Sequence, residues 1–168
     1  GPASAIDVCA RWSAAAAALG AEVVELNGER VGSGNAHDWV MDAPGDAALL
    51  PALASSLIDT ARASAPRALV SWTSHDHPKW HRLPWRQILG PGGVDLHAPQ
   101  IYAADTRSDA PEGHRQAAGR LASAAAQWRI LVDVGEVRPE LGPGGSGWCA
   151  YGQIHGLTTA GALMVLDS

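Results

Sequence analysis

Polar side chains that could carry out chemistry lie at the ends of five predicted strands. In chain order they are Glu25 and Asn27, then His75 and Asp76, then Gln100 and Tyr102, then Asp133 and Glu136, and last Asp167. If the strands run parallel in a barrel, their carboxyl ends converge on one face, where the active sites of such barrels lie. One acid at a strand end is more often a loop cap, but several at corresponding ends predict a shared site.

Glu25 is the leading candidate for a catalytic group. It lies between apolar neighbours in the stretch 23–26, which reads as a strand buried on at least one side. Burial raises the pKa of a carboxyl group because the charged form loses hydration. A raised pKa suits the general acid of glycosidic bond cleavage. That reaction also uses a second carboxylate, and the candidates are Asp76, Asp133 and Glu136.

The aromatic composition is biased toward tryptophan, with 7 Trp, 2 Tyr and no Phe. An indole combines a large flat surface with a hydrogen-bond donor, so it suits stacking on sugar rings and also suits core packing. Trp80 and Trp85 are two such stacking candidates. The residues predicted to bind a substrate are Asn27, Trp72, His75, His77, Gln100 and Tyr102.

The histidine cluster supports a competing interpretation. His75 and His77 flank Asp76, and two imidazoles at a strand end can bind a metal together with a carboxylate from another strand. This pattern would indicate a metal-dependent hydrolase. In the alternative that we favour, Pro78 fixes the loop and the histidines form hydrogen bonds within it or to a substrate. No further ligand motif strengthens the metal interpretation, so no metal is assigned.

Several other classes of function are disfavoured. No Gly-x-Gly-x-x-Gly follows a strand, and the stretch 142–145 lacks the Lys and Ser/Thr of a phosphate loop, so we expect no cofactor. No Gly-x-Ser-x-Gly elbow is present. A net charge of −5 with 17% charged residues argues against a partner nucleic acid. The longest apolar run, 14–19, is too short to cross a membrane. Cys9 and Cys149 are expected to be buried free thiols.

The elements that must position these residues alternate along the chain. Helices are predicted over 6–19, 46–65, 84–89, 112–128 and 147–159, and strands over 21–27, 68–74, 94–103, 129–137 and 162–167. The fold class is therefore α/β, with parallel strands joined by right-handed crossovers. In the first helix, Cys9, Trp12, Ala16 and Leu19 are expected to face inward.

Length limits how complete such a barrel can be. A closed (β/α)₈ barrel takes ~250 residues, whereas this chain has 168. We therefore expect a partial or trimmed TIM-type barrel: a single domain over 3–168, part of a larger barrel, whose open strands are covered by a partner chain or oligomer. Gly1-Pro2 resembles the residue pair left after protease removal of a tag.

Alternation in the second strand predicts its two faces. Val70 and Trp72 should pack on helices, whereas Ser71, Thr73 and His75 should line a barrel interior that opens to the site.

The segment from Leu69 to Tyr102 resembles glycoside-hydrolase-like (β/α) barrels, including the peptidoglycan-cleaving endolysins of phages and prophages. The resemblance is carried by VSWTSHDHPKWHRLPW and APQIYAAD. The stretch VVELNGE resembles the strand that ends in the acid of such barrels, which implies that role for Glu25. In the muramidase type that strand ends Asp-x-Glu, whereas here Val23 stands at the Asp position.

The resemblance implies a glycoside hydrolase acting on a polysaccharide, with bacterial cell-wall peptidoglycan as its substrate. The departure at Val23 keeps a third alternative open, a non-catalytic carbohydrate-binding or structural module of a larger phage or secreted protein.

Overall fold

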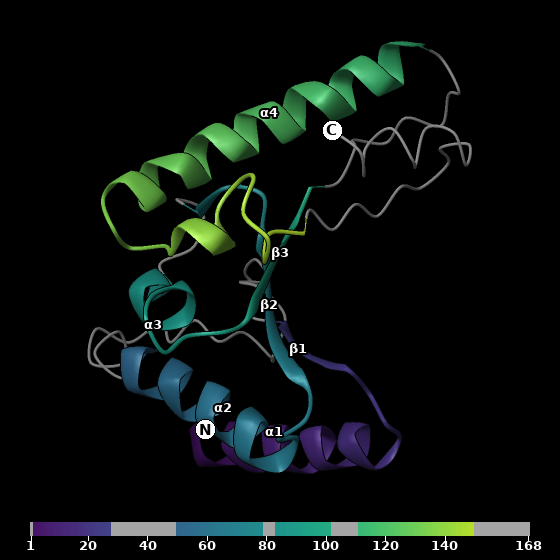
Figure 1. Ribbon diagram of the computed structural model, residues 1–168, viewed down its shortest axis with the longest axis vertical. Coiled ribbons are helices and arrows are strands. Elements are labelled where there is room, and N and C mark those ends of the chain that lie inside the picture. Colours follow the sequence, from purple (N-terminus) through teal and green to yellow (C-terminus); the bar gives the residue numbers. More distant parts are fainter. Residues whose placement is uncertain (1, 28–49, 79–82, 102–110, 150–168) are drawn as a thin grey trace.

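The computed structural model describes residues 2–27, 50–78, 83–101 and 111–149. Helices and strands alternate along the chain (Figure 1). The elements are α1 (Pro2–Ala18), β1 (Val23–Asn27), α2 (Leu50–Ser64), β2 (Leu69–His75), α3 (Trp85–Leu89), β3 (Leu96–Gln100), α4 (Pro111–Asp133) and the short 3-10 helix η3 (Pro139–Leu141). The predicted α/β class is confirmed, and the predicted elements that fall in the described part up to residue 128 are present with shifted ends.

The three strands form one parallel sheet in the order β1-β2-β3. After α4 the chain returns to the free side of β3 and forms a parallel bridge between Trp148 and His97. There the His97 N–H donates to the Gly147 carbonyl at 2.8 Å, and the Cys149 N–H donates to the His97 carbonyl at 2.9 Å. Segments that follow one another along the chain therefore lie side by side in the sheet, from β1 through β2 and β3 to the bridge at Trp148.

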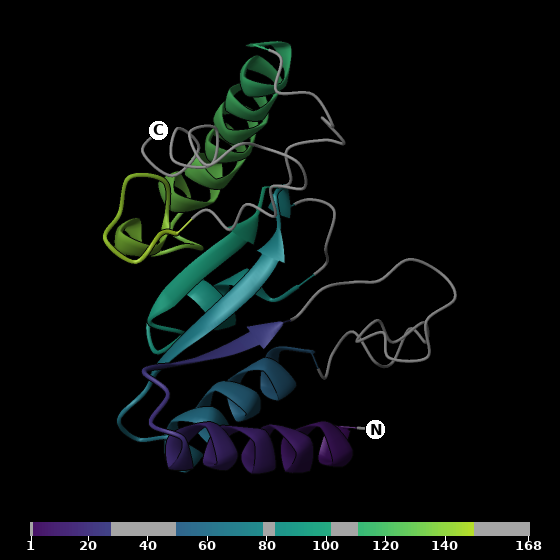
Figure 2. The same ribbon diagram turned by 90° about the vertical axis from the view of Figure 1, so that its right-hand side faces the viewer.

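The two faces of the sheet differ in what covers them. The helix-covered face carries Val24, Val70, Trp72 and His97, which are buried against α2, α3 and α4. The opposite face carries Glu25, Ser71, Thr73, Ala98 and Gln100. Figure 2 looks onto this opposite face, with the strands in front of α3. The alternation predicted for β2 is confirmed.

Helix α1 packs on α2 through a face that includes two of the four predicted residues, Cys9 and Ala16. The buried or half-buried positions are Ala5, Ile6, Cys9, Ala10, Ser13 and Ala16. The Cys9 Sγ lies 3.5 Å from the Leu57 carbonyl. Trp12 and Leu19 are 73% and 88% exposed, so their predicted inward orientation is wrong. The prediction failed because apolar character alone does not say which side of an Ala-rich helix meets its neighbour.

The predicted strand over 129–137 is wrong. Helix α4 continues to Asp133, and Gly135, with φ 75°, ends it. The Gly135 N–H donates to the Val132 carbonyl and the Glu136 N–H to the Leu131 carbonyl, which is the Schellman pattern of a helix terminus. The β-branched residues of this stretch therefore belong to the last turns of a helix.

The rest of the predicted C-terminal part is corrected or lies outside the described residues. The chain at 147–149 forms the bridge to β3, where a helix had been predicted to start. The remainder of that helix and the strand 162–167 fall outside the described ranges. No helix in these ranges is both long and apolar enough to span a membrane.

Candidate functional site

The polar strand-end residues of β2 and β3 meet at one edge of the sheet. His75 pairs in register with Gln100. Asn27 pairs with Thr73, which lies two residues before His75 in β2. We call Asn27, His75, Asp76, His77 and Gln100 the carboxyl edge. Gln100 is buried at 5% exposure and Asn27 is exposed, so the edge changes from sheltered to open across the sheet.

Asp76 and His77 follow directly after β2 and are largely sheltered. Their side chains are 14% and 16% exposed, and the His77 Nε2 lies 4.0 Å from the Asp76 Oδ2. A protonated imidazole at this distance would form an ion pair with the carboxylate. The pair supplies an acid, a base and hydrogen-bonding groups within one sheltered corner of the edge.

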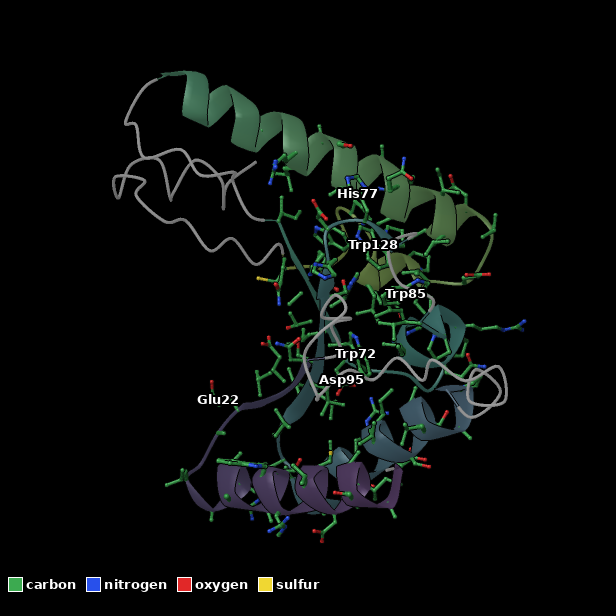
Figure 3. All side chains as sticks on the ribbon, turned by 180° about the vertical axis from the view of Figure 1, so that it is seen from behind. Glu22, Trp72, His77, Trp85, Asp95 and Trp128 are labelled. Carbon is green, nitrogen blue, oxygen red and sulfur yellow. The ribbon has the colours of Figure 1, made fainter. Side chains whose placement is uncertain are left out.

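Two tryptophans from different helices bind the backbone of this segment. The Trp128 Nε1–H of α4 donates to the Asp76 carbonyl at 2.8 Å, and the Trp85 Nε1–H of α3 donates to the Pro78 carbonyl at 3.3 Å. The two rings meet edge to face at 4.9 Å, between α3 and α4 (Figure 3). The two indoles therefore hold the backbone of residues 76–78, whereas the role of Pro78 in fixing the loop stays a prediction.

His97 lies under the carboxyl edge, on the helix-covered face. Its Nδ1 is 3.1 Å from the Leu141 carbonyl and its Nε2 is 2.9 Å from the Ser74 Oγ. Burial lowers the pKa of His97 to about 3, and the hydrogen bond with the Leu141 carbonyl opposes this shift only in part. The neutral ring carries its hydrogen on Nδ1, because a carbonyl can only accept. The Ser74 hydroxyl, which also lies 3.1 Å from the His75 carbonyl, therefore donates to Nε2.

Sequence reasoning did not single out His97. The signal available was its position between Leu96 and Ala98 in a strand, on the side that alternation assigns to the helices. Its ring packs edge to face on Trp128 at 4.4 Å and on Trp148 at 5.0 Å. With 0% exposure, His97 offers no surface to a ligand.

Glu25 lies on the face of the sheet that the helices do not cover, and it precedes the carboxyl edge along β1. It pairs with Ser71, and β2 continues from there for roughly 13 Å to His75 before Asp76 follows. Carboxylates that cleave glycosides together lie about 5–9.5 Å apart. Glu25 is also exposed, so the burial expected for it is absent. The structure therefore does not bring Glu25 and Asp76 together as a pair.

Other predicted site residues lie elsewhere. Trp72 and Trp85 are core residues, with 1% and 6% exposure, so their predicted role in stacking on sugars is wrong. Asp133 and Glu136 are exposed at the end of α4, so their predicted place at a strand end is wrong as well. Trp80, Tyr102 and Asp167 lie outside the described residues.

The structure gives no ligand set for the metal interpretation. In the described ranges, no three His, Cys, Asp or Glu side chains gather closely enough to hold a metal ion. The cysteines are both free, with Cys9 buried as predicted and Cys149 exposed, contrary to prediction. Burial raises the pKa of the Cys9 thiol, with partial opposition from its hydrogen bond with Ser13, which favours an inert structural thiol.

One buried hydroxyl on the opposite face is incompletely satisfied. Thr73 is 1% exposed, and its Oγ1 forms no hydrogen bond within the part of the chain that the structure describes. Its register neighbours are Asn27 on β1 and Ala98 on β3. An unpaired hydroxyl in such a place costs stability.

Comparison of the chain with protein-family models, with curated proteins and with solved structures finds no significant match.

Proposed function

We propose that this protein binds a polysaccharide at its carboxyl edge and cleaves glycosidic bonds, acting on bacterial cell-wall peptidoglycan. One observation carries the proposal. Three adjacent parallel strands place polar side chains at the carboxyl edge, and α2, α3 and α4 cover one face of the sheet. Ligands of parallel α/β folds bind at the carboxyl ends of the strands.

The winding of the sheet supports a partial barrel of the (β/α) type. Consecutive strands are neighbours, and the helices that follow them lie on one face. A doubly wound sheet would reverse its strand order and place helices on both faces. The bridge at Trp148 continues the same winding past β3.

The side chains at the edge suit a polyhydroxylated ligand. Asn27 and His75 can form hydrogen bonds with sugar hydroxyls, and the Asp76 carboxylate accepts charge-assisted hydrogen bonds, whereas Gln100 is buried. In the proposed reaction the glycan extends from the carboxyl edge along β1 to the exposed Glu25, which lies two residues before Asn27 and is the general acid. Glu25 gives its proton to the glycosidic oxygen as that bond breaks, and water adds to the anomeric carbon and gives up a proton that restores the acid form of Glu25.

A specific observation favours a second candidate function, non-catalytic binding of the same glycan. Glu25 and Asp76 are separated along the sheet by more than a two-carboxylate mechanism uses. The binding groups of the carboxyl edge need no such spacing, so a binding module would use the edge without Glu25.

One experiment separates the two candidates. Binding to purified peptidoglycan and release of reducing ends are measured for the native chain, Glu25→Gln, Asp76→Asn and the control Glu22→Gln. Glu22 is exposed and precedes β1, at the opposite end of the sheet. Hydrolysis predicts that Glu25→Gln lowers the release of reducing ends about 100-fold or more while Glu22→Gln leaves it unchanged.

The remaining outcomes are equally informative. Binding without release, weakened by Asp76→Asn, establishes the binding module and removes the hydrolase. Release that stops on dialysis against a chelator and returns with zinc favours a metal-dependent hydrolase using His75 and His77. If the native chain neither binds peptidoglycan nor releases reducing ends, the proposed function is overturned.

A further inference from the structure

We propose that Trp128 and Trp85 are positioning residues, which together set the geometry of Asp76 and His77 at the carboxyl edge. We call the two side chains the indole clamp. The inference rests on the proposed function only for the identity of the ligand, because the clamp itself is defined by contacts within the chain.

The clamp joins two helices to one short segment of backbone. The Asp76 carbonyl accepts from α4 at 2.8 Å and the Pro78 carbonyl accepts from α3 at 3.3 Å. These carbonyls lie on either side of His77, so the backbone of that residue is fixed at both ends. The side chains of Asp76 and His77 take their positions from this backbone.

The clamp is itself immobilised by the core. Trp128 and Trp85 are 0% and 6% exposed, and their rings meet edge to face with an interplanar angle of 82°. The ring of Trp128 also packs on His97, which is hydrogen-bonded to Ser74 and Leu141. A binding group held by a packed second layer keeps its geometry within the narrow tolerance that recognition needs.

A purely space-filling tryptophan would not need its donor aimed at this segment. Both indole N–H groups of the clamp reach carbonyls of a three-residue stretch, although they come from helices far apart in sequence. Trp148 offers the matched comparison. It packs edge to face on His97 and Trp128, and its backbone forms the bridge to β3.

The test compares Trp128→Phe and Trp85→Phe with the control Trp148→Phe. Each substitution keeps an aromatic ring and removes an indole N–H. Amide hydrogen exchange is measured by NMR for Asp76 and His77 and, as a reference for global stability, for Val70 in the core of β2. We expect exchange at Asp76 and His77 to quicken about tenfold relative to Val70 in Trp128→Phe. In Trp148→Phe the same ratio should stay at its native value.

The ring signals of His77 and the affinity for soluble peptidoglycan fragments complete the test. In Trp128→Phe the His77 signals should shift and the dissociation constant should rise about tenfold. If Trp128→Phe fails to fold, Trp85→Phe provides the same comparison. Equal acceleration at Asp76, His77 and Val70 in both clamp variants, with native His77 signals, would overturn the inference. If the native chain does not bind peptidoglycan, the proposed function fails, while hydrogen exchange still decides for or against the clamp.

Discussion

At the scale of single residues, alternation along β2 was enough to predict which side chains face the helices and which face away. The burial of Val70 and Trp72 followed from that pattern, because one face of a strand packs on helices in any α/β fold. The environment of Glu25 did not follow. Its exposure depends on the register between β1 and β2 and on what covers the sheet, neither of which a single strand encodes.

Buried His97 should make the protein sensitive to acid. Its pKa is about 3 in the folded chain and about 6.5 when unfolded, so the unfolded chain binds more protons between these values. The stabilising effect is complete above pH 6.5 and is lost as the pH falls toward 3. Between pH 7 and pH 5 the free energy of unfolding should fall by about 2 kcal/mol from this residue.

Urea unfolding of the native chain and of His97→Gln at the two pH values checks this expectation. We expect the glutamine variant to be less stable at neutral pH. Between pH 7 and pH 5 its free energy of unfolding should fall by about 2 kcal/mol less than that of the native chain. An equal pH dependence in the two proteins would show that His97 is not the responsible group.

Thr73 and Ser74 should respond in opposite directions when their hydroxyls are removed. Thr73→Val replaces an unpaired buried hydroxyl with a methyl group of similar shape and should raise the free energy of unfolding by about 1 kcal/mol. Ser74→Ala removes the hydrogen bond to the His97 Nε2 and should lower it by about 1–2 kcal/mol. Chemical denaturation measures both, and a loss of stability in Thr73→Val would show that its hydroxyl is satisfied.

At the scale of elements, the order of helices and strands was predictable up to α4, and the end of α4 was not. The β-branched stretch after Trp128 suggested a strand, but Gly135 supplies the left-handed conformation that closes a helix. Gly135, within the stretch 129–137, is the sequence signal for the end of this helix. A helix that ends there places Asp133 and Glu136 away from the strand ends.

The amino end of the sheet is held by a contact between elements that the sequence did not reveal. Arg62 of α2 donates to the carbonyls of Gly92 and Gly93 and to the Asp95 Oδ1 at 2.8 Å. The Asp95 Oδ2 accepts from the Val70 N–H at 2.9 Å (Figure 3 labels Asp95). A network of this kind depends on residues brought together only by the fold.

Arg62→Lys should therefore destabilise the protein although it keeps the charge. A lysine cannot reproduce the fork that joins two carbonyls and a carboxylate, and we expect a loss of about 1–2 kcal/mol in the free energy of unfolding. Glycan binding should stay at its native level, because this network lies at the end of the sheet away from the carboxyl edge. Weakened binding without a loss of stability would contradict this assignment.

At the scale of the whole molecule, a parallel sheet that adds each strand beside the last brings the carboxyl ends of its strands to one edge. The alternation of elements predicted parallel neighbouring strands, since each connection is long enough for a crossover and strand twist makes nearly all such crossovers right-handed. The indole clamp and the His97 network, by contrast, join α3, α4 and β2 across long stretches of sequence. Packing of the complete fold determines them, so no local pattern could have predicted them.

The most direct test of the central claim is to locate ligand binding on the molecule by NMR. Soluble peptidoglycan fragments are titrated into the labelled protein, and backbone amide shifts are followed at both ends of the sheet. Binding at the carboxyl edge predicts that the largest shifts fall at Asn27, His75, Asp76, His77 and Gln100, with Arg62 and Asp95 unchanged. Shifts centred on Arg62 and Asp95, or no shifts at saturating fragment, would contradict the account.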